Sequence, residues 1–214
     1  MPVSNIKQEK IKLRNSIKKQ RQNFSIKIKN NLDKKIQRNL YKIWQYKRSE
    51  LVLTYVSKEI EVDTINIIKK ALQDGKKVAV PICIVDGCLM DFHYITSIED
   101  DLENGAFGVL EPIVEKCEKV TDFSNAVCIV PGFSFDSKGF RLGYGKGYYD
   151  RFLNNFNGVT IGLCYSSCVR WELPHGYYDK EVDFLVTDKY FRKINKITKK
   201  IDVWFKIDKG KDWI

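Results

Sequence analysis

Short apolar runs rich in β-forming residues recur along the chain, and segments of helical periodicity separate them. Such runs are typical of strands buried on both faces of a sheet. One separating segment, residues 62–77, carries apolar residues at helical steps and meets a stop signal at Gly75. Strands that alternate with helices predict a layered α/β fold with a mostly parallel sheet. The predicted strands are ELVLTYVS (50–57), KVAVPICIV (77–85), AVCIVPG (126–132), GVTIGLCY (158–165) and VDFLVTD (182–188).

Two amphipathic helices are predicted ahead of the first strand. The first has an apolar stripe of Ile6, Leu13, Ile17 and Phe24. Ser25 is placed to cap the second, whose apolar face holds Ile28, Leu32, Ile36, Leu40 and Ile43. Asp86-Gly87 favours a hairpin between the second strand and the run CLMDFHYI. We therefore expect a three-layer α/β/α fold with a mostly parallel, Rossmann-like mixed sheet and two basic N-terminal helices.

The positive charge of the chain is concentrated in those two helices. Residues 1–48 hold 15 Lys and Arg against 2 acidic residues (+13), and the rest hold 22 against 25 (−3), which gives the net +10. A solvated helix face accounts for most of these lysines, and a nucleic-acid clamp is the alternative. The few aromatic residues of this segment are placed to pack, so we expect no nucleic-acid partner.

Length and composition suit one globular domain. A chain of 214 residues that is 43% hydrophobic can bury a substantial core. We expect residues 1–190 to form this domain and residues 191–214 to be an extension, either helical or partly ordered. No apolar run approaches the roughly 20 residues that span a bilayer, so we expect a cytoplasmic protein with no membrane partner. We also expect a monomer. The six cysteines contain no C-x-x-C pair and are expected to be free thiols.

A glycine-rich stretch, RLGYGKGYYDRF at residues 141–152, points to an anion site. Gly143, Gly145 and Gly147 alternate with other residues beside Arg141 and Lys146. The following apolar spacing predicts a helix that begins close to Gly147. Glycine amides at a helix N-terminus bind phosphates well, and the two cations add charge. A flexible turn beside incidental cations is the alternative, because neither the P-loop nor the dinucleotide pattern fits.

A longer stretch around these glycines carries a family resemblance. PGFSFDSKGFRLGYGKGYYDRFL at 131–153 closely resembles the signature of the 5-formyltetrahydrofolate cyclo-ligase family, P-G-x-x-F-D followed by R-L-G-x-G-x-G-Y-Y-D. Four further blocks are similar to family patterns and occur in the family's order. They are KIKLRNSIKKQR near the N-terminus, SKEIEVDTI, GVLEP and PHGYYDKEVDFLVTD.

The resemblance implies an ATP-dependent ligase of folate one-carbon metabolism. Its substrates would be 5-formyltetrahydrofolate and MgATP, and its products 5,10-methenyltetrahydrofolate, ADP and phosphate. Transfer of the γ-phosphoryl group to the formyl oxygen would activate the carbon toward N10, which requires positioning and charge stabilisation. Lys146 and Arg141 are the implied catalytic residues. The implied ATP-binding residues are Lys10, Arg14, Arg141, Leu142, Gly143, Tyr144, Gly145, Lys146, Gly147, Tyr148 and Tyr149.

The resemblance also implies a metal pair and a folate site. Asp150 and Asp179 match the family's Mg²⁺ ligands; Asp183 is a rival to Asp179, and Asp150 also suits the first turn of its helix. Glu61 matches a substrate-contacting glutamate, and a helix-start acid is its alternative reading. Val56 aligns with a position that usually carries a larger apolar side chain. The full implied substrate-binding set is Val56, Glu61, Tyr144, Gly145, Lys146, Gly147 and Tyr148.

Overall fold

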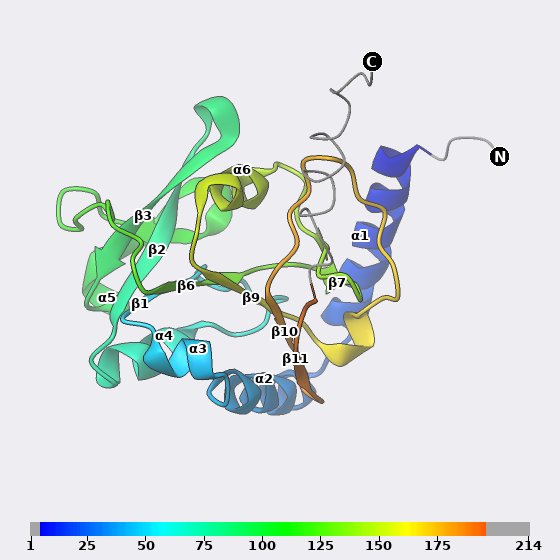
Figure 1. Ribbon diagram of the computed structural model, residues 1–214, viewed down its shortest axis with the longest axis horizontal. Coiled ribbons are helices and arrows are strands. Elements are labelled where there is room, and N and C mark those ends of the chain that lie inside the picture. Colours follow the sequence, from blue (N-terminus) through cyan, green and yellow to red (C-terminus); the bar gives the residue numbers. More distant parts are fainter. Residues whose placement is uncertain (1–4, 196–214) are drawn as a thin grey trace, which may run out of the picture.

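The computed structural model describes residues 5–195, and a seven-stranded sheet forms its centre (Figure 1). The five inner strands run parallel to one another, and the edge strands β11 and β3 are antiparallel to them. The predicted mostly parallel mixed sheet is therefore confirmed. In spatial order the strands are β11 (Phe191–Lys193), β10 (Phe184–Val186), β9 (Val159–Leu163), β6 (Ala126–Val130), β1 (Leu51–Leu53), β2 (Lys77–Ile84) and β3 (Leu89–Ile95).

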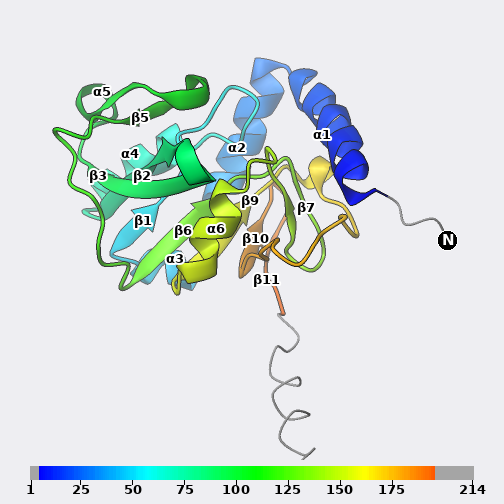
Figure 2. The ribbon, with the colours of Figure 1, turned by 90° about the horizontal axis from the view of Figure 1, so that it is seen from above.

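Helices cover both faces of this sheet, as the predicted three-layer arrangement requires. Figures 1 and 2 show α2 (Ile26–Leu40), α3 (Trp44–Arg48) and α4 (Ile65–Gln73) on one face, and α6 (Tyr148–Asn155) on the other. Helix α1 (Ile6–Gln22) stands beside the carboxyl ends of the inner strands, next to the segment that leaves β6. In open α/β sheets this edge is where ligands bind.

The two N-terminal helices form in the predicted segments, but their predicted apolar stripes are only partly buried. Ile6 and Ile28 are 43% and 52% exposed, and Phe24 and Ile43 lie beyond the ends of α1 and α2. The side chain of Ser25 accepts a hydrogen bond from the Ile28 N–H at 3.3 Å, so it caps α2 as expected. Ile17 of α1 and Ile36 and Leu40 of α2 are fully buried in the hydrophobic core. The basic residues of α2 lie on its solvent-facing side, where their charges stay hydrated, so the helix accommodates many of them.

The hairpin and the helix after β1 also form as predicted. Strands β2 and β3 pair antiparallel around the short η1 turn (Asp86–Cys88), and Gly75 ends α4 with φ of +74°. Strand β1 is shorter than the expected 50–57 because the chain leaves the sheet after Leu53. The sequence did not predict η2 (Ala106–Gly108), η3 (Ser166–Cys168), α3, α5 (Ile98–Asp101), β4 (Leu102–Asn104), β5 (Leu110–Pro112), β7 (Ser134–Phe135) and β8 (Arg141–Leu142).

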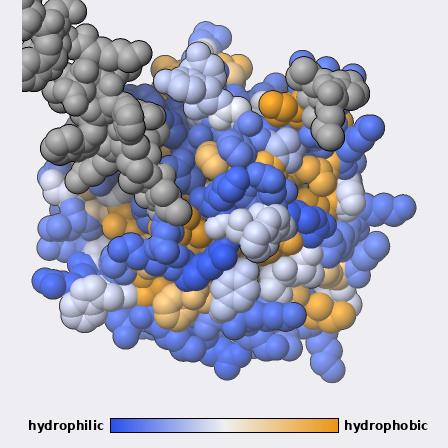
Figure 3. Space-filling model, turned by 45° about the vertical axis from the view of Figure 1, so that its right-hand side comes forward, coloured by the Kyte–Doolittle hydropathy of each residue, from blue (hydrophilic) through white to orange (hydrophobic). Residues whose placement is uncertain are grey.

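The start of the predicted C-terminal extension belongs to the sheet. Residues 191–193 form β11, which pairs with β10, and residues 196–214 lie outside the described residues. All six cysteines, which fall within residues 5–195, are free thiols. Across that same span no helix combines the length and the apolar character needed to cross a membrane. Hydrophilic residues predominate on the face that carries α1, with hydrophobic ones in smaller patches (Figure 3).

Candidate active site

The glycine stretch forms a turn between a small hairpin and α6. Strands β7 and β8 pair antiparallel, and the chain then passes through Gly143–Gly147 into the helix. Gly145 and Gly147 have φ of +96° and +79°, a region that side chains disfavour, and Gly147 is the N-cap of α6. The predicted helix start close to Gly147 is confirmed. This turn leaves the first amides of α6 directed away from the helix, as an anion site requires.

Two cations of α1 reach this turn and the loop after η3. Arg14 Nε donates to the Gly143 carbonyl at 2.7 Å, and a Cβ at Gly145 would lie 3.0 Å from Arg14 Nη2. Partial burial lowers the pKa of Arg14, while Asp179 acts against this. One turn earlier, Lys10 Nζ lies 2.6 Å from Asp179 Oδ2. The i, i+4 spacing thus places both predicted ATP contacts of α1 at one site.

Arg141 and Asp150 form a second ion pair next to the first. Arg141 Nη2 donates to Asp150 Oδ1 at 2.9 Å, and Nη1 donates to the Lys180 carbonyl at 2.9 Å. The Lys180 N–H donates to the same Asp150 oxygen at 3.2 Å. Arg141 is buried, with its guanidinium 5.9 Å from the centre of the Tyr149 ring. The arginine therefore joins α6 to the 176–180 loop. Its predicted contact with the ATP phosphates stays a prediction.

The two aspartates proposed as alternatives in the second metal position have different surroundings. Burial acts to raise the pKa of Asp179, but the bonds from Lys10 and the Gly176 N–H, with the charges of Lys10 and Arg141, hold it below its usual value. Asp183 instead accepts bonds from the Thr160 N–H and hydroxyl at 2.8 and 2.7 Å. Of the two, Asp179 lies with α1 and Arg141.

The predicted folate residues gather on the loop after β1 and on the glycine turn. Glu61 is buried, and its Oε2 accepts the Lys58 N–H at 2.8 Å. Burial raises the pKa of Glu61, and hydrogen bonds from Lys58 and the Tyr144 side chain oppose that rise. The Lys58 ammonium lies 5.7 Å from the centre of the Tyr144 ring. Val56 is also buried, so it presents little surface to a ligand.

The remaining predicted residues differ in exposure. Lys146 is exposed at the tip of the glycine turn, and Tyr148 is half-buried at the first position of α6. The Leu142 side chain is 1% exposed and belongs to the core, and its carbonyl accepts the Phe133 N–H at 2.7 Å. The Tyr149 hydroxyl is buried. The side chains of Leu142 and Tyr149 therefore pack beneath the glycine turn, on its core side. Any contact that these two residues make with a ligand would come from their main-chain groups.

A comparison with models of protein families shows which family the chain belongs to. Residues 6–188 match the model of the 5-formyltetrahydrofolate cyclo-ligase family. The chain belongs to the 5-formyltetrahydrofolate cyclo-ligase family. This membership, and with it the predicted enzyme class, is confirmed.

Individual cyclo-ligase relatives agree with the family match. A probable 5-formyltetrahydrofolate cyclo-ligase of Schizosaccharomyces pombe is 31% identical over 166 residues, which cover 70% of this chain and 81% of the relative. The Aquifex aeolicus 5,10-methenyltetrahydrofolate synthetase structure has a TM-score of 0.75 and 34% identity, covering 86% of this chain and 92% of its own. A Mycoplasma pneumoniae synthetase structure, at 22% identity and TM-score 0.68, supports the fold, covering 84% and 99%.

Sequence reasoning about the cyclo-ligase site missed several residues that the fold brings to it. Arg21 is 3% exposed and lies on the same face of α1 as Lys10 and Arg14. The spacing of these three residues, i, i+4 and i+11, could have indicated from the sequence that they share a face. Asp33, one of only two acids among residues 1–48, is 4% exposed. Lys58 carried no signal, since its position depends on how the loop after β1 folds.

Proposed function

We propose that the protein converts 5-formyltetrahydrofolate to 5,10-methenyltetrahydrofolate in a reaction that consumes MgATP and releases ADP and phosphate. Family membership supports the substrate pair. The observation that carries the proposal is the meeting of α1 with the glycine turn through Arg14 and with the 176–180 loop through Lys10. It gathers cations, main-chain amides and two carboxylates at the carboxyl edge of the sheet.

The chemistry requires activation of a poor leaving group. The formyl oxygen of the substrate attacks the γ-phosphorus of ATP, the bond to the β–γ bridging oxygen breaks, and ADP leaves. N10 then attacks the activated formyl carbon and loses its proton. The carbon–oxygen bond breaks, and phosphate departs with the former formyl oxygen. This sequence needs alignment and charge stabilisation more than an enzyme nucleophile.

The glycine turn supplies the phosphate side of the proposed site. Among residues 5–195, no heavy atom other than those of Gly143 and its two chain neighbours lies within 4 Å of where a Cβ at Gly143 would stand, so a phosphate oxygen has room to approach the main chain there. Lys146 is exposed on the same turn and is proposed to stabilise charge on the transferred phosphoryl group. Gly145, Gly147, Tyr148 and Tyr149 would contribute amides at the start of α6.

The two ion pairs fit the binding of MgATP by exchange of partners. In the structure Lys10 pairs with Asp179, and Arg141 pairs with Asp150. Bound Mg²⁺ would shield the phosphate charge and orient the nucleotide, with Asp150 and Asp179 as its protein ligands. Within residues 5–195 no three His, Cys, Asp or Glu residues are grouped to hold a metal, so the remaining ligands would be phosphate oxygens and water. Lys10 and Arg141 would then turn toward the phosphates.

Glu61 defines the proposed folate side. Its buried carboxylate lies between the Lys58 N–H and Tyr144, where it can accept bonds from the N–H edge of a pterin. Tyr148 would line the same side, to which the buried Val56 would add little contact area. Tyr144, with its ring packed 4.7 Å from that of Phe133, would stand between the two substrates. We propose a monomer whose partners are these two small molecules, without nucleic acid.

The proposal is tested by mixing the purified protein with 5-formyltetrahydrofolate and MgATP and following the near-ultraviolet absorbance of the methenyl product. Absorbance should rise only when both substrates and the metal are present, and ADP should appear in equal amount. Addition of EDTA in excess over Mg²⁺ should stop the reaction. If no absorbance change occurs with any divalent metal, the proposed function is wrong.

A further inference from the structure

Arg21 is a buried cation that the reaction chemistry does not use. It is 3% exposed, and it lies in the last turn of α1. Its Nη2 donates to the carbonyls of Gly132 and Phe133 at 2.7 and 2.8 Å, and its Nη1 donates to the Ile60 carbonyl at 3.3 Å. One guanidinium thereby holds two segments that are far apart in sequence.

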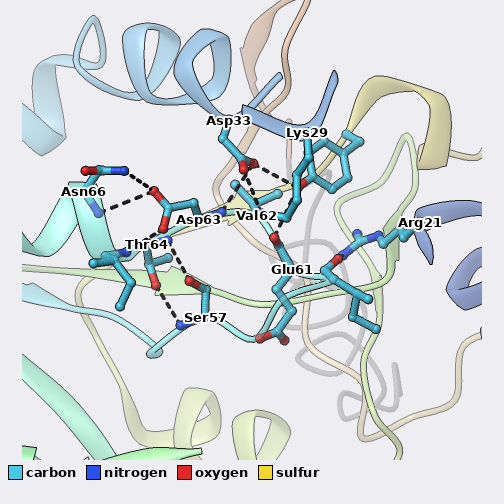
Figure 4. A network of polar contacts seen from close by, with 12 residues as sticks. Arg21, Lys29, Asp33, Ser57, Glu61, Val62, Asp63, Thr64 and Asn66 are labelled. Atoms are coloured by element: carbon cyan, nitrogen blue, oxygen red, sulfur yellow. Dashed lines mark hydrogen bonds and ion pairs between the residues drawn. The ribbon is translucent and has the colours of Figure 1, made fainter. Parts of the chain in front are cut away.

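These two segments carry the two halves of the proposed site. Gly132 and Phe133 begin the loop that continues into the glycine turn, and Ile60 directly precedes Glu61. Figure 4 shows Arg21 extending from α1 toward the segment that carries Glu61. The guanidinium carbon lies 5.7 Å from the centre of the Phe133 ring and 5.2 Å from that of Tyr165. Both distances fall within cation–π range, so the two rings fix the orientation of the guanidinium plane.

We propose that Arg21 is a positioning residue that holds the Glu61 loop and the glycine turn in register, so that folate and nucleotide meet correctly. This inference rests on the proposed function. Arg14 and Arg21 bond to the middle and to the start of the same loop from one face of α1. A lysine could not replace Arg21, because a single ammonium cannot reach three carbonyls on two segments with fixed geometry.

Tyr165 holds the Glu61 loop from the side opposite Arg21. Its hydroxyl lies 2.8 Å from Asp33 Oδ1 and 3.1 Å from the Glu61 carbonyl oxygen. Asp33 Oδ2 accepts a bond from Lys29 at 2.7 Å, and Asp33 Oδ1 also accepts the Asp63 N–H at 3.3 Å. The backbone on either side of Glu61 is therefore tied to α1 and α2, and through Tyr165 to the segment after β9.

The charge of Arg21 also acts on Glu61 directly. The charged and titratable groups that face this carboxylate are Arg21 from α1, Lys58 from its own loop, Tyr55 after β1, Tyr144 from the glycine turn and Tyr149 from α6. Lys58 and Arg21 are the cations among them. Removal of the Arg21 charge should therefore make Glu61 harder to ionise.

The first test compares Arg21→Lys with Arg192→Lys. Arg192 is a matched control because it also donates to a backbone carbonyl, that of Asp136, and within residues 5–195 its buried Nε has no hydrogen-bond partner, as is the case for Arg21 Nε. Arg21→Lys should lower kcat with 5-formyltetrahydrofolate about 100-fold, the cost of a displacement near 1 Å, while the KM for ATP changes little. Arg192→Lys should retain wild-type kcat. Equal kcat values for the two variants would overturn the proposal.

A second measurement separates positioning from general stability. Arg21→Met removes the charge, so the pH at which 5-formyltetrahydrofolate binding is half-maximal should rise relative to wild type, whereas Arg21→Lys should leave it in place. An unchanged midpoint in the Met variant would refute the electrostatic part of the proposal. Wild-type protein that neither binds nor converts 5-formyltetrahydrofolate would instead show that the proposed function has failed.

A milder variant covers the case in which Arg21 substitutions do not fold. Tyr165→Phe removes only the hydroxyl beside the Glu61 carbonyl. Tyr46→Phe is its control, since the buried Tyr46 hydroxyl has no hydrogen-bond partner in the described part of the chain. Tyr165→Phe should weaken 5-formyltetrahydrofolate binding about 5-fold, the value of one hydrogen bond. Tyr46→Phe should not change binding. A wild-type affinity for Tyr165→Phe would contradict the register role of this network.

Discussion

Lys10 Nζ lies 2.6 Å from Asp179 Oδ2, and this contact joins the first helix to the loop that precedes β10. Both side chains are largely buried, at 16% and 20% exposed. The Gly176 N–H donates to the same Asp179 oxygen at 2.6 Å. A proposed phosphate-binding cation and a proposed metal ligand thus form an ion pair with each other, which we expect MgATP to separate.

The first prediction concerns this pair and acid stability. Because the pKa of Asp179 is lowered in the folded protein, its ionised form stabilises the fold at pH above the unfolded value, near 3.9. That contribution is lost as pH falls through the folded pKa. Asp179→Asn should therefore lower the free energy of unfolding by about 1 kcal/mol at pH 7 and by less at pH 2. Urea titrations at both pH values measure the difference, and an equal loss at pH 2 would argue against the pair.

The same variant should affect metal use more than folding. Asp179→Asn is expected to raise the Mg²⁺ concentration needed for half-maximal turnover at least 10-fold, whereas Asp183→Asn should not. Asp183 is bonded to Thr160 and serves as its control. A larger effect from Asp183→Asn would exchange the roles of the two aspartates.

The second prediction separates two glycines that look alike in sequence. Gly145 has φ of +96°, and a Cβ there would press on Arg14, so Gly145→Ala should cost about 1–2 kcal/mol of stability and displace the arginine. Gly143 has open space around it. Gly143→Ala should keep wild-type stability but weaken ATP binding, because the methyl group would occupy the position of a phosphate oxygen. Thermal melts with and without MgATP distinguish these outcomes, and unchanged ATP binding in Gly143→Ala would place the phosphates elsewhere.

The third prediction contrasts the two cations of the glycine stretch. Lys146 is exposed, so Lys146→Ala should reduce kcat at least 100-fold and change the free energy of unfolding by less than about 0.5 kcal/mol. Arg141 is buried and bonded to Asp150 and the Lys180 carbonyl. Arg141→Lys should therefore lower both kcat and stability, the latter by about 1–3 kcal/mol. Turnover and urea titration on the same preparations give both values; parallel losses of activity and stability in Lys146→Ala would show that the lysine is structural.

Much of the fold was predictable because each element follows from a local pattern. The stripes of α1 and α2, the Ser25 cap, the Asp86-Gly87 hairpin and the start of α6 near Gly147 all depend on neighbouring residues. Strands β7 and β8 were not predictable. They contain two residues each and exist only because the loop between β6 and α6 folds back on itself.

The site was predictable as a set of residues but not as a set of contacts. The family signature indicated Arg141 and Asp150 separately, yet their ion pair depends on the packing of β8 against α6. Arg21 and Glu61 are 40 positions apart in the chain, and only the fold brings the arginine to the carbonyl next to the glutamate. Burial of a charged residue is a property of the assembled layers, which composition does not reveal.

The last prediction concerns the ionisation of Glu61. Burial raises the pKa of this carboxyl in the folded protein, so the folded state holds its proton to higher pH than the unfolded state does. Stability from this group is greatest below the unfolded pKa, near 4.3, and declines as pH rises through the folded value. Glu61→Gln should remove that decline of stability with pH and leave the protein at least as stable at pH 7.

Ligand binding should show the opposite trend: 5-formyltetrahydrofolate should bind wild type more tightly as Glu61 ionises, and the Gln variant should bind weakly at every pH. Calorimetric titrations from pH 5 to 8, paired with urea titrations, measure both trends, and a Gln variant with wild-type affinity would remove Glu61 from the folate site.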